Sequence, residues 1–235
     1  MLKKYLKVFK DLLFPPLCFY CEKKIDDGLL CLNCQNNIEF LYPPLCRYCS
    51  IPIKDNKTML CKNCLGKTSF YERVVSITSY KEPIITLIHL LKYRHYDYIS
   101  NFLSSLISKH LLNLGLDFSS YDLITSVPLH PIKYKEREYN QSTLLAKALE
   151  EKFRIPFAEN IIYEKKLKVS QTKLKKDERK ENVRDAFLTK IDLKEKNIIL
   201  VDDILTTGST ISECAKALKE KGANHIFVIT LSKTL

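Results

Sequence analysis

Four Cys-x-x-Cys pairs within residues 18–64 constrain this chain of 235 residues more than any other feature. The stretches FPPLCFYC at 14–21 and YPPLCRYC at 42–49 form a near-repeat, and each carries one of the pairs. Two residues between thiols let both sulfurs point at one ion, and a second pair completes a tetrahedral shell of thiolates that suits zinc. The eight candidate metal ligands are Cys18, Cys21, Cys31, Cys34, Cys46, Cys49, Cys61 and Cys64. The repeat favours one site from the first four and a second from the last four, although the spacing also allows a crossed arrangement.

Paired cysteines have two other common uses, and both fit this chain poorly. A thioredoxin-like redox motif is single and precedes a helix. A disulfide framework belongs to secreted proteins, but the opening residues MLKKYLKVFKDLLF lack the uninterrupted apolar stretch of a secretory signal. We therefore expect a cytoplasmic protein with two structural zinc ions, since four cysteines leave no open position for a catalytic water. The ninth cysteine, Cys214, stands on the apolar face of a predicted helix, and we expect it to be buried and inert.

The chain divides by composition into three parts, at residues 1–14, 15–66 and 67–235. The first part predicts a basic amphipathic helix that either packs on its own domain or rests on a membrane surface or a partner. The second is the cysteine segment. In the third, strands alternate with helices, which predicts an α/β fold with a doubly wound parallel sheet. Strands are expected at 73–80, 122–128, 161–166, 197–203 and 225–231, and helices within 84–113, at 140–153 and at 209–222.

The charge of the chain points to anionic ligands without choosing among them. The net charge is +11, and most of the excess lies in residues 67–235. Such a surface suits nucleic acid, phosphorylated ligands or an anionic membrane, and solubility alone is an equally open interpretation. No run approaches eighteen apolar residues, so we expect no transmembrane span.

The stretch VDDILTTGST at 201–210 is the clearest ligand-binding signal in the chain. An apolar strand delivers Asp202 and Asp203 to its carboxyl end, the edge where open α/β sheets bind ligands. A hydroxyl-rich turn and a helix follow, and a helix N-terminus with free N–H groups favours an anion. Gly208 lets the backbone approach that anion closely, while the carboxylates suit hydroxyl groups or a hydrated Mg²⁺. The pattern predicts a sugar phosphate site; it is not a Walker A loop, because no Gly-Lys-Ser/Thr follows.

VDDILTTGST resembles the 5-phosphoribosyl 1-pyrophosphate (PRPP) motif of type I phosphoribosyltransferases. Together with VPLHPIKYKEREYNQSTLLAKAL at 127–149, QTKLKKDERKENVRDAF at 171–187 and the paired zinc ribbons, the chain from about residue 14 onward resembles the ComF family of bacterial competence proteins. The resemblance implies a type I phosphoribosyltransferase-like fold in which the acid pair Asp202 and Asp203 binds the ribose hydroxyls. It also implies that the 5-phosphate is held by Thr206, Thr207, Gly208, Ser209 and Thr210, with His130, Lys133, Lys135 and Arg137 on the pyrophosphate side.

The same resemblance implies a role. We expect the protein to bind PRPP with Mg²⁺ and to act in DNA uptake during natural transformation, with single-stranded DNA along its basic surface and other competence proteins as partners. The alternative is an active phosphoribosyltransferase that transfers the phosphoribosyl group to an unidentified acceptor. The Lys-rich residues 164–185 occupy the place of a mobile cover over the reaction centre, or form a solvated hairpin. No segment after 225–231 supplies a hood over a nucleobase, although part of the zinc module could substitute, and no catalytic residue is assigned.

Overall fold

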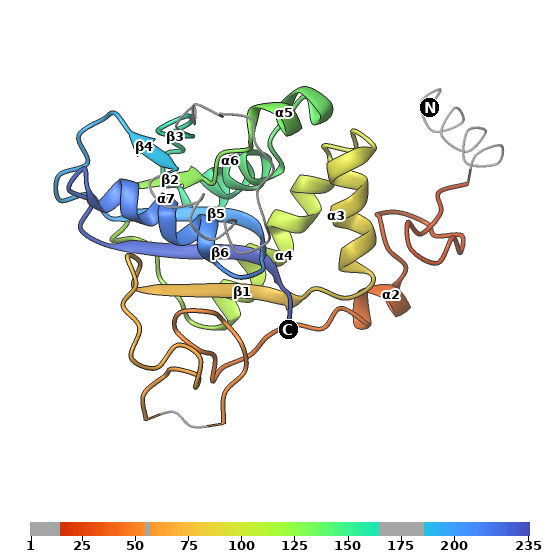
Figure 1. The fold of residues 1–235 in the computed structure, drawn as a ribbon. Coiled ribbons are helices and arrows are strands. Elements are labelled where there is room, and N and C mark those ends of the chain that lie inside the picture. The colour runs from red at the N-terminus through yellow and green to blue at the C-terminus, as the bar shows by residue number, and fades with distance from the viewer. Residues whose placement is uncertain (1–14, 55–56, 165–185) are drawn as a thin grey trace, which may run out of the picture.

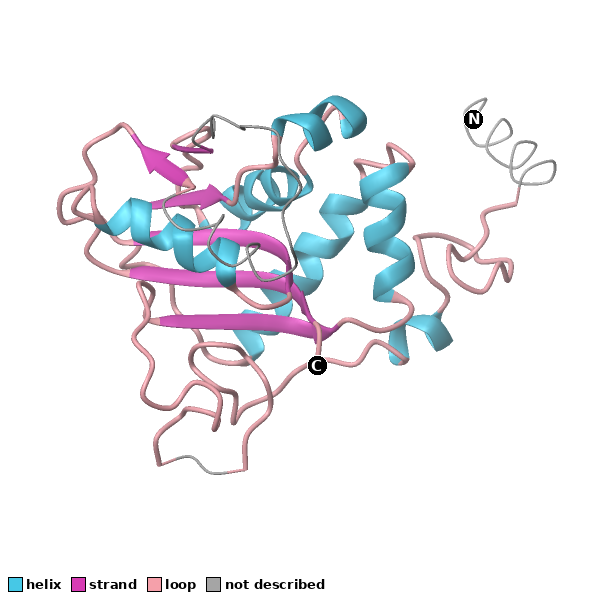
Figure 2. Cartoon of the chain, in the orientation of Figure 1, coloured by secondary structure: helices cyan, strands magenta, loops and turns pink. Residues whose placement is uncertain are grey.

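A four-stranded parallel sheet forms the centre of the protein (Figure 1; Figure 2). The computed structural model describes residues 15–54, 57–164 and 186–235. The strand order is β1-β6-β5-β2, so the two central strands come from the C-terminal part of the chain and the two outer strands from earlier parts. The strands are β1 (Arg73–Ser79), β2 (Leu123–Ser126), β5 (Ile198–Leu205) and β6 (Ile226–Lys233). All three neighbouring pairs are parallel, which confirms the predicted α/β sheet.

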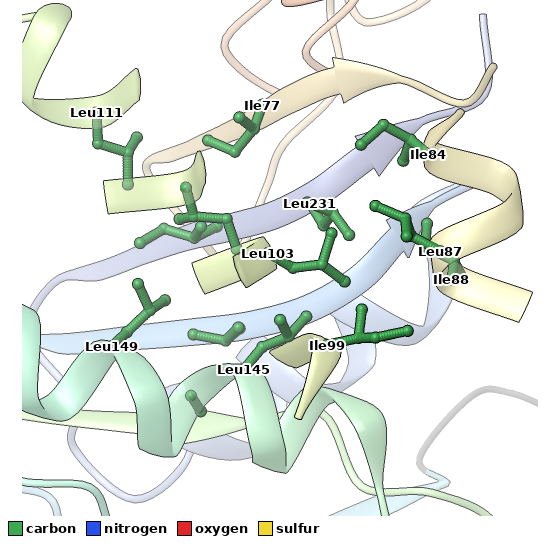
Figure 3. Packing of buried hydrophobic residues seen from close by; sticks show 14 of the residues in the cluster. Ile77, Ile84, Leu87, Ile88, Ile99, Leu103, Leu111, Leu145, Leu149 and Leu231 are labelled. Atoms are coloured by element: carbon green, nitrogen blue, oxygen red, sulfur yellow. The ribbon is translucent and has the colours of Figure 1, made fainter. Parts of the chain in front are cut away.

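Helices cover both faces of this sheet. Strand β5 is apolar along most of its length because Ile199 and Val201 face one buried cluster, while Ile198 and Leu200 face the other. Burial on both sides explains the continuous apolar run in the sequence. Figure 3 shows Leu103, Leu145 and Leu149 among the buried side chains of the first cluster. That cluster packs beneath α3 (Ile84–Tyr93), α4 (Ile99–Asn113) and α6 (Gln141–Phe153), and the other packs beneath α7 (Ser209–Lys219).

Three smaller elements complete the described part of the chain. A two-stranded antiparallel sheet joins β3 (Ile162–Glu164) to β4 (Phe187–Thr189). A single short helix, α2 (Leu32–Asn36), lies in the cysteine segment. Helix α5 (Pro131–Arg137) follows β2, where the sequence analysis assigns no helix. The helix forms because Pro131 fixes its first residue in a helical conformation and His130 Nδ1 accepts a hydrogen bond from Ile132 N at 3.2 Å.

The cysteine segment is attached to β1, the strand at one edge of the sheet. Leu41 N donates to Ile77 O at 2.9 Å, and Val74 N donates to Arg47 O at 2.9 Å. These bonds occupy backbone groups that an edge strand otherwise leaves unpaired. The buried hydroxyl of Ser50 adds a third link by accepting from Ser76 N at 2.8 Å. The cysteine segment therefore completes the sheet edge as well as carrying the thiols.

Two predictions lie outside the described residues. They are the amphipathic helix of residues 1–14 and the Lys-rich cover formed by most of 164–185. Within the described part of the chain, no helix is long and apolar enough to cross a membrane. The division of the chain at residues 66 and 67 stays a prediction.

Candidate functional site

The eight paired cysteines form two clusters, as the repeat favours. One holds Cys18, Cys21, Cys31 and Cys34, and the other holds Cys46, Cys49, Cys61 and Cys64; the sulfurs of each lie within 4.8 Å of one another. All are free thiols. The facing sulfurs of Cys21 and Cys31 are 3.7 Å apart, and those of Cys49 and Cys61 are 3.6 Å apart. A tetrahedral zinc with bonds of about 2.3 Å has a sulfur–sulfur edge of about 3.8 Å. The donor set thus fits two structural zinc ions.

The backbone around each cluster favours thiolate. Burial opposes ionisation of Cys18, but N–H groups of Cys21, Cys31 and Tyr20 outweigh it and lower the pKa of that thiol to about 6. Burial likewise opposes ionisation of Cys46, and hydrogen bonds from the backbone lower its pKa to about 7. Thiolate is the form that binds metal, so each cluster presents at least one ligand ready for a cation.

A polar pocket lies at the carboxyl edge of the sheet, where β2 and β5 end. Its volume is about 280 Å³. Asp202 from β5 and Thr210 from α7 line it on one side, and His130 and Lys133 line it on the other. Ser142, at the start of α6, borders the same space. The pocket therefore brings one predicted ribose ligand, one phosphate ligand and two predicted pyrophosphate ligands together.

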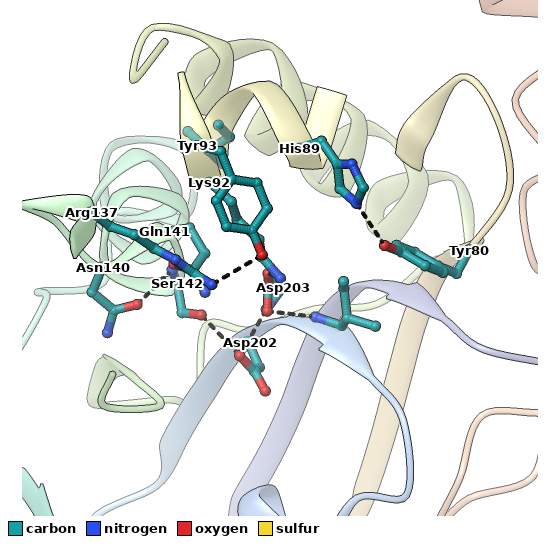
Figure 4. Close-up of polar contacts among 12 residues, drawn as sticks. Tyr80, His89, Lys92, Tyr93, Arg137, Asn140, Gln141, Ser142, Asp202 and Asp203 are labelled. Carbon is teal, nitrogen blue, oxygen red and sulfur yellow. Dashed lines mark hydrogen bonds and ion pairs between the residues drawn. The ribbon is translucent and has the colours of Figure 1, made fainter. Parts of the chain in front are cut away.

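Asp202 points into this pocket and is held there by the start of α6. Its Oδ1 accepts a hydrogen bond from Ser142 Oγ at 2.9 Å (Figure 4). Asn140 fixes that serine, because its Oδ1 caps the helix at Ser142 N and its Nδ2 donates to Val127 O at 2.8 Å. Burial, followed by the charge of Asp203, raises the pKa of Asp202 from 3.8 to about 7. The carboxyl group is thus poised to lose its proton near neutral pH when a cation or hydroxyl group binds.

Asp203 faces the opposite side of β5, because neighbouring residues of a strand alternate. Its carboxylate pairs with the ammonium of Lys92, in the last turn of α3 (Figure 4). Both side chains are mostly buried, with 14% and 8% of their surface exposed for Lys92 and Asp203. Asp203 Oδ2 has this ion pair and no hydrogen bond among the described residues. The family resemblance gives both acids the same role, but the structure places Asp202 at the pocket and pairs Asp203 with Lys92.

Residues 206–210, which follow β5 and include the first two residues of α7, are here called the phosphate turn. They lie next to Asp202. A small pocket is lined by Asp202, Thr206 and Gly208 together with Ser209 and Thr210. Gly208 adopts φ +79°, in the left-handed region that a residue with a Cβ enters at a cost. A Cβ at this position would lie 3.4 Å from Leu205 Cδ1. The backbone conformation thus favours the glycine predicted from the motif.

The four predicted pyrophosphate ligands differ in placement. His130 and Lys133 line the pocket, whereas Lys135 is exposed and does not line it. Arg137 is buried: its Nη1 donates to Gln141 Oε1 at 3.2 Å and its Nη2 to Tyr93 Oη at 3.3 Å (Figure 4). Its guanidinium carbon also lies 4.9 Å from the centre of the Tyr93 ring. Arg137 therefore joins α3, α5 and α6 in addition to carrying charge near the site.

Three polar residues at the site receive no role from the sequence pattern. Ser142 and Asn140 position Asp202, and Lys92 neutralises Asp203. Asn140 and Ser142 belong to a stretch that carries the family resemblance, so that resemblance could have pointed to them. Lys92 offers no such signal, because only the packing of α3 on the sheet brings it to Asp203.

Comparisons with known proteins agree with this organisation. Residues 9–73 match the double zinc ribbon domain, and residues 141–233 match the phosphoribosyl transferase domain. The chain is 30% identical to competence protein F of Haemophilus influenzae over 226 residues, which cover 92% of this chain and 90% of that one. It is 32% identical to DNA utilization protein YhgH of Escherichia coli K12 over 179 residues, which cover 74% of this chain and 78% of that one.

Two matches concern narrower features. A stretch of 52 residues is 46% identical to ribose-phosphate pyrophosphokinase of Campylobacter jejuni, covering 21% of this chain and 17% of the enzyme. Among solved structures, adenine phosphoribosyltransferase of Thermoanaerobacter pseudethanolicus is 16% identical with a TM-score of 0.38, covering 68% of this chain and 90% of that one. The family follows from these two relatives and the two matched domains: this chain belongs to the ComF/YhgH family, in which a double zinc ribbon precedes a phosphoribosyltransferase domain.

Proposed function

We propose that this protein binds PRPP with Mg²⁺ at the carboxyl edge of its sheet. The observation that carries the proposal is the position of Asp202, which borders both the small pocket of the phosphate turn and the larger pocket beside His130 and Lys133. A ribose that carries a 5-phosphate at one end and a pyrophosphate at the other needs three features in this order. They are an anion-binding turn for the 5-phosphate, a carboxylate for the hydroxyl groups and cations for the pyrophosphate. In this arrangement the phosphate turn takes the 5-phosphate, because the start of α7 offers free N–H groups and hydroxyls.

The carboxylates bind the ribose hydroxyls directly or through a hydrated Mg²⁺. Asp202 does so in the geometry described above. Asp203 takes part once Lys92 releases it. On the pyrophosphate side, His130 and Lys133 provide the nearest donors, while Lys135 and Arg137 add positive charge.

Titration calorimetry with PRPP and Mg²⁺ tests the site. We expect saturable binding that is lost after Asp202→Ala combined with Asp203→Ala. Gly208→Ala should weaken binding roughly fivefold or more, because the new Cβ strains the phosphate turn by about 1 kcal/mol. Gly115→Ala is the matched control: Gly115 also has a positive φ, +67°, but lies in open space after α4. Equal losses in the two glycine variants, or no heat with the unaltered protein, would argue against the site.

We further propose a role in DNA uptake through binding of single-stranded DNA. Support comes from the printed names of the relatives, one a competence protein and one a DNA utilization protein. Exposed rings add to it: Tyr96 and Tyr98, at the joint between α3 and α4, stack at 5.7 Å, and Phe19 of the cysteine segment stacks on Tyr96 at 5.7 Å. Such rings give bases a surface on which to stack, and the net charge of +11 favours the backbone.

Fluorescence anisotropy with a labelled oligonucleotide checks the DNA role. Tyr98→Ala should weaken binding at least about fivefold, since stacking contributes roughly 1–3 kcal/mol per base. Tyr163→Ala serves as control, because Tyr163 is similarly exposed, 42% against 49%, and lies in β3 instead. The logarithm of the binding constant should also fall with the logarithm of the salt concentration. Binding that changes neither with salt concentration nor with Tyr98→Ala would contradict this role.

The alternative function is transfer of the phosphoribosyl group to an acceptor. The match to the phosphoribosyl transferase domain favours it. Attack on the anomeric carbon would release pyrophosphate, and the protein would contribute orientation and charge stabilisation without a covalent intermediate. Release of pyrophosphate in the presence of nucleobases or single-stranded DNA distinguishes transfer from binding alone.

A further inference from the structure

We propose that the second zinc ribbon (residues 42–66) holds the phosphate turn in its anion-binding shape, with Tyr71 as the positioning residue between them. The first ribbon (residues 15–41) has no such connection. Metal in the second cluster and ligand at the phosphate turn are therefore linked, whereas metal in the first cluster supports only the fold. The consequence for ligand affinity rests on the PRPP site proposed above, but the physical link between ribbon and turn does not.

The second ribbon and the phosphate turn face each other across one cleft. The cleft has a volume of about 400 Å³. Two metal-ligand cysteines, Cys49 and Cys64, line it on one side, and Thr207, Gly208 and Ser209 line it on the other. The ribbon and the turn are far apart in the sequence, so this proximity arises from the tertiary fold.

The side chain of Tyr71 lies between the second ribbon and the phosphate turn. It is buried, with 7% exposed, and its hydroxyl donates to Tyr48 O at 2.8 Å. Tyr48 lies inside the Cys46–Cys49 knuckle, and its ring meets the Tyr71 ring edge-on at 6.3 Å. The same Tyr71 hydroxyl lies 3.8 Å from the position that a Cβ would take at Gly208. One side chain is therefore hydrogen-bonded to the cysteine knuckle and lies next to the turn at Gly208.

The end of β6 holds the other side of the turn. Lys233 is buried, and its Nζ donates to Thr206 O at 2.9 Å and to Leu205 O at 3.3 Å. Thr234 Oγ1 donates to Leu205 O at 3.1 Å. The turn is thus fixed at its start by β6 and restrained at Gly208 by Tyr71.

The knuckle itself depends on the metal for its shape. The shell of four thiolates connects it to the 61–64 pair, and a small cysteine-rich segment has little apolar core to replace that connection. On its other side the knuckle is bonded to β1, through Arg47 O and Ser50 Oγ. Loss of the ion frees the knuckle from the 61–64 pair, so Tyr48 no longer provides a fixed acceptor for Tyr71.

The first ribbon is anchored elsewhere. Cys18, Leu30 and Ile38 belong to the hydrophobic cluster beneath α3 and α4, and Phe19 stacks on Tyr96. No residue of this ribbon lines the cleft beside Tyr71 or either of the two pockets that Asp202 borders. Figure 1 shows the two halves of the cysteine segment on different sides, one next to α3 and the other below β1.

Amide hydrogen exchange on the ligand-free protein tests the link without reference to PRPP. Cys49→Ser with Cys61→Ser removes two facing ligands of the second cluster, and Cys21→Ser with Cys31→Ser removes the matching pair from the first. The amide of Ser212 donates to Gly208 O at 2.9 Å, so its exchange reports on the shape of the turn. We expect it to exchange at least about tenfold faster in the second-ribbon variant and within about twofold of the parent in the first-ribbon variant. Tyr71→Phe, which keeps the ring, should accelerate the same amide about fivefold.

Thr78→Val is the matched control for Tyr71→Phe. It also deletes one hydroxyl-to-carbonyl hydrogen bond, from Thr78 Oγ1 to Leu231 O at 3.0 Å, but touches neither the knuckle nor the turn. We expect unchanged exchange of the Ser212 amide in this variant. In calorimetry, the variants in which the turn exchanges faster should bind PRPP more weakly. We therefore expect weaker binding by Tyr71→Phe and the second-ribbon variant, and unchanged binding by Thr78→Val and the first-ribbon variant.

The outcomes separate the two proposals. If the parent protein binds no PRPP, the proposed ligand is wrong, and exchange alone still decides the link. The link is overturned if Tyr71→Phe leaves the turn as protected as in the parent, a result available even when the second-ribbon variant does not fold. Equal acceleration by both ribbon variants would also overturn it, because that result would indicate general loss of stability.

Discussion

At the scale of single residues, Asp202 is the side chain whose surroundings most affect its chemistry. It lies at the end of a buried strand, beside a second acid and below a hydrogen-bonding serine. Burial and the neighbouring charge of Asp203 raise its pKa to about 7. A carboxyl group with this pKa changes its charge near neutral pH. Both the stability of the protein and its affinity for ligand should therefore depend on pH.

The pH dependence has a definite sign. The folded pKa of Asp202 lies above the value of 3.8 of an unperturbed aspartate, so the folded state holds the proton more tightly. The stability that this proton contributes is present below about pH 4 and is lost as pH rises to about 7. Asp202→Asn removes the titration, and its free energy of unfolding relative to the parent should rise by on the order of 1 kcal/mol between pH 5 and pH 8.

Urea unfolding at a series of pH values provides the measurement for Asp202. Asp192→Asn, which alters an exposed carboxylate, should follow the parent at every pH. A difference between Asp202→Asn and the parent that stays constant from pH 5 to pH 8 would show that Asp202 does not titrate there. PRPP affinity of the parent should rise over the same interval, because the ionised carboxylate binds Mg²⁺ and hydroxyl groups.

At the scale of elements, the Lys92–Asp203 ion pair connects α3 to the end of β5. Both partners are mostly buried, so removing one leaves a charge with little access to water. Lys92→Met should destabilise the protein by about 3 kcal/mol, and adding Asp203→Asn should restore part of that loss. Chemical denaturation of the two single variants and the double variant gives the coupling energy.

An exposed pair provides the comparison for this double-mutant cycle. Lys81 and Glu39 lie 2.7 Å apart, with 61% and 45% of their side chains exposed. Lys81→Met should cost less than about 1 kcal/mol, because water screens the pair. Similar losses at Lys92 and Lys81 would mean that burial does not control the strength of the α3–β5 connection.

At the scale of the whole molecule, the zinc ribbons are part of the structural support of the α/β sheet. The first ribbon contributes Cys18, Leu30 and Ile38 to the cluster beneath α3, α4 and α6. The second bonds to the edge of β1 through Arg47 and Ser50. Metal removal should therefore destabilise the sheet together with the cysteine segment.

Metal analysis should find two zinc ions per chain and one after removal of either matched pair of cysteines. Chelation should lower the thermal midpoint of the entire protein, by roughly 2–4 °C for each kcal/mol of stability lost. Far-UV circular dichroism follows this transition, because the sheet and its helices dominate the signal. One zinc ion in the unaltered chain contradicts the two-site arrangement, and an unchanged midpoint after chelation contradicts the supporting role.

The sequence alone determined the features that depend on residues close together in the chain. Cysteine spacing predicted four knuckles, because two intervening residues direct both sulfurs to one point, and the repeat favoured the grouping that the structure has. Continuous apolar runs defined the parallel strands, and the turn after Asp203 needed Gly208 for its left-handed backbone. Helix α5 was missed because its start depends on a local cap, His130, that also reads as a loop residue.

Only the tertiary structure decided which distant groups meet at these local features. The packing of α3 neutralises Asp203 with Lys92, and the start of α6 turns Ser142 toward Asp202. The same packing buries Arg137, which the sequence presents as one of several equivalent cations. Burial and the placement of opposite charges come from contacts between remote segments, and they set the cost of ionisation at each group. Local spacing therefore predicted the candidate ligands, and the three-dimensional fold decided which of them are charged, paired and accessible.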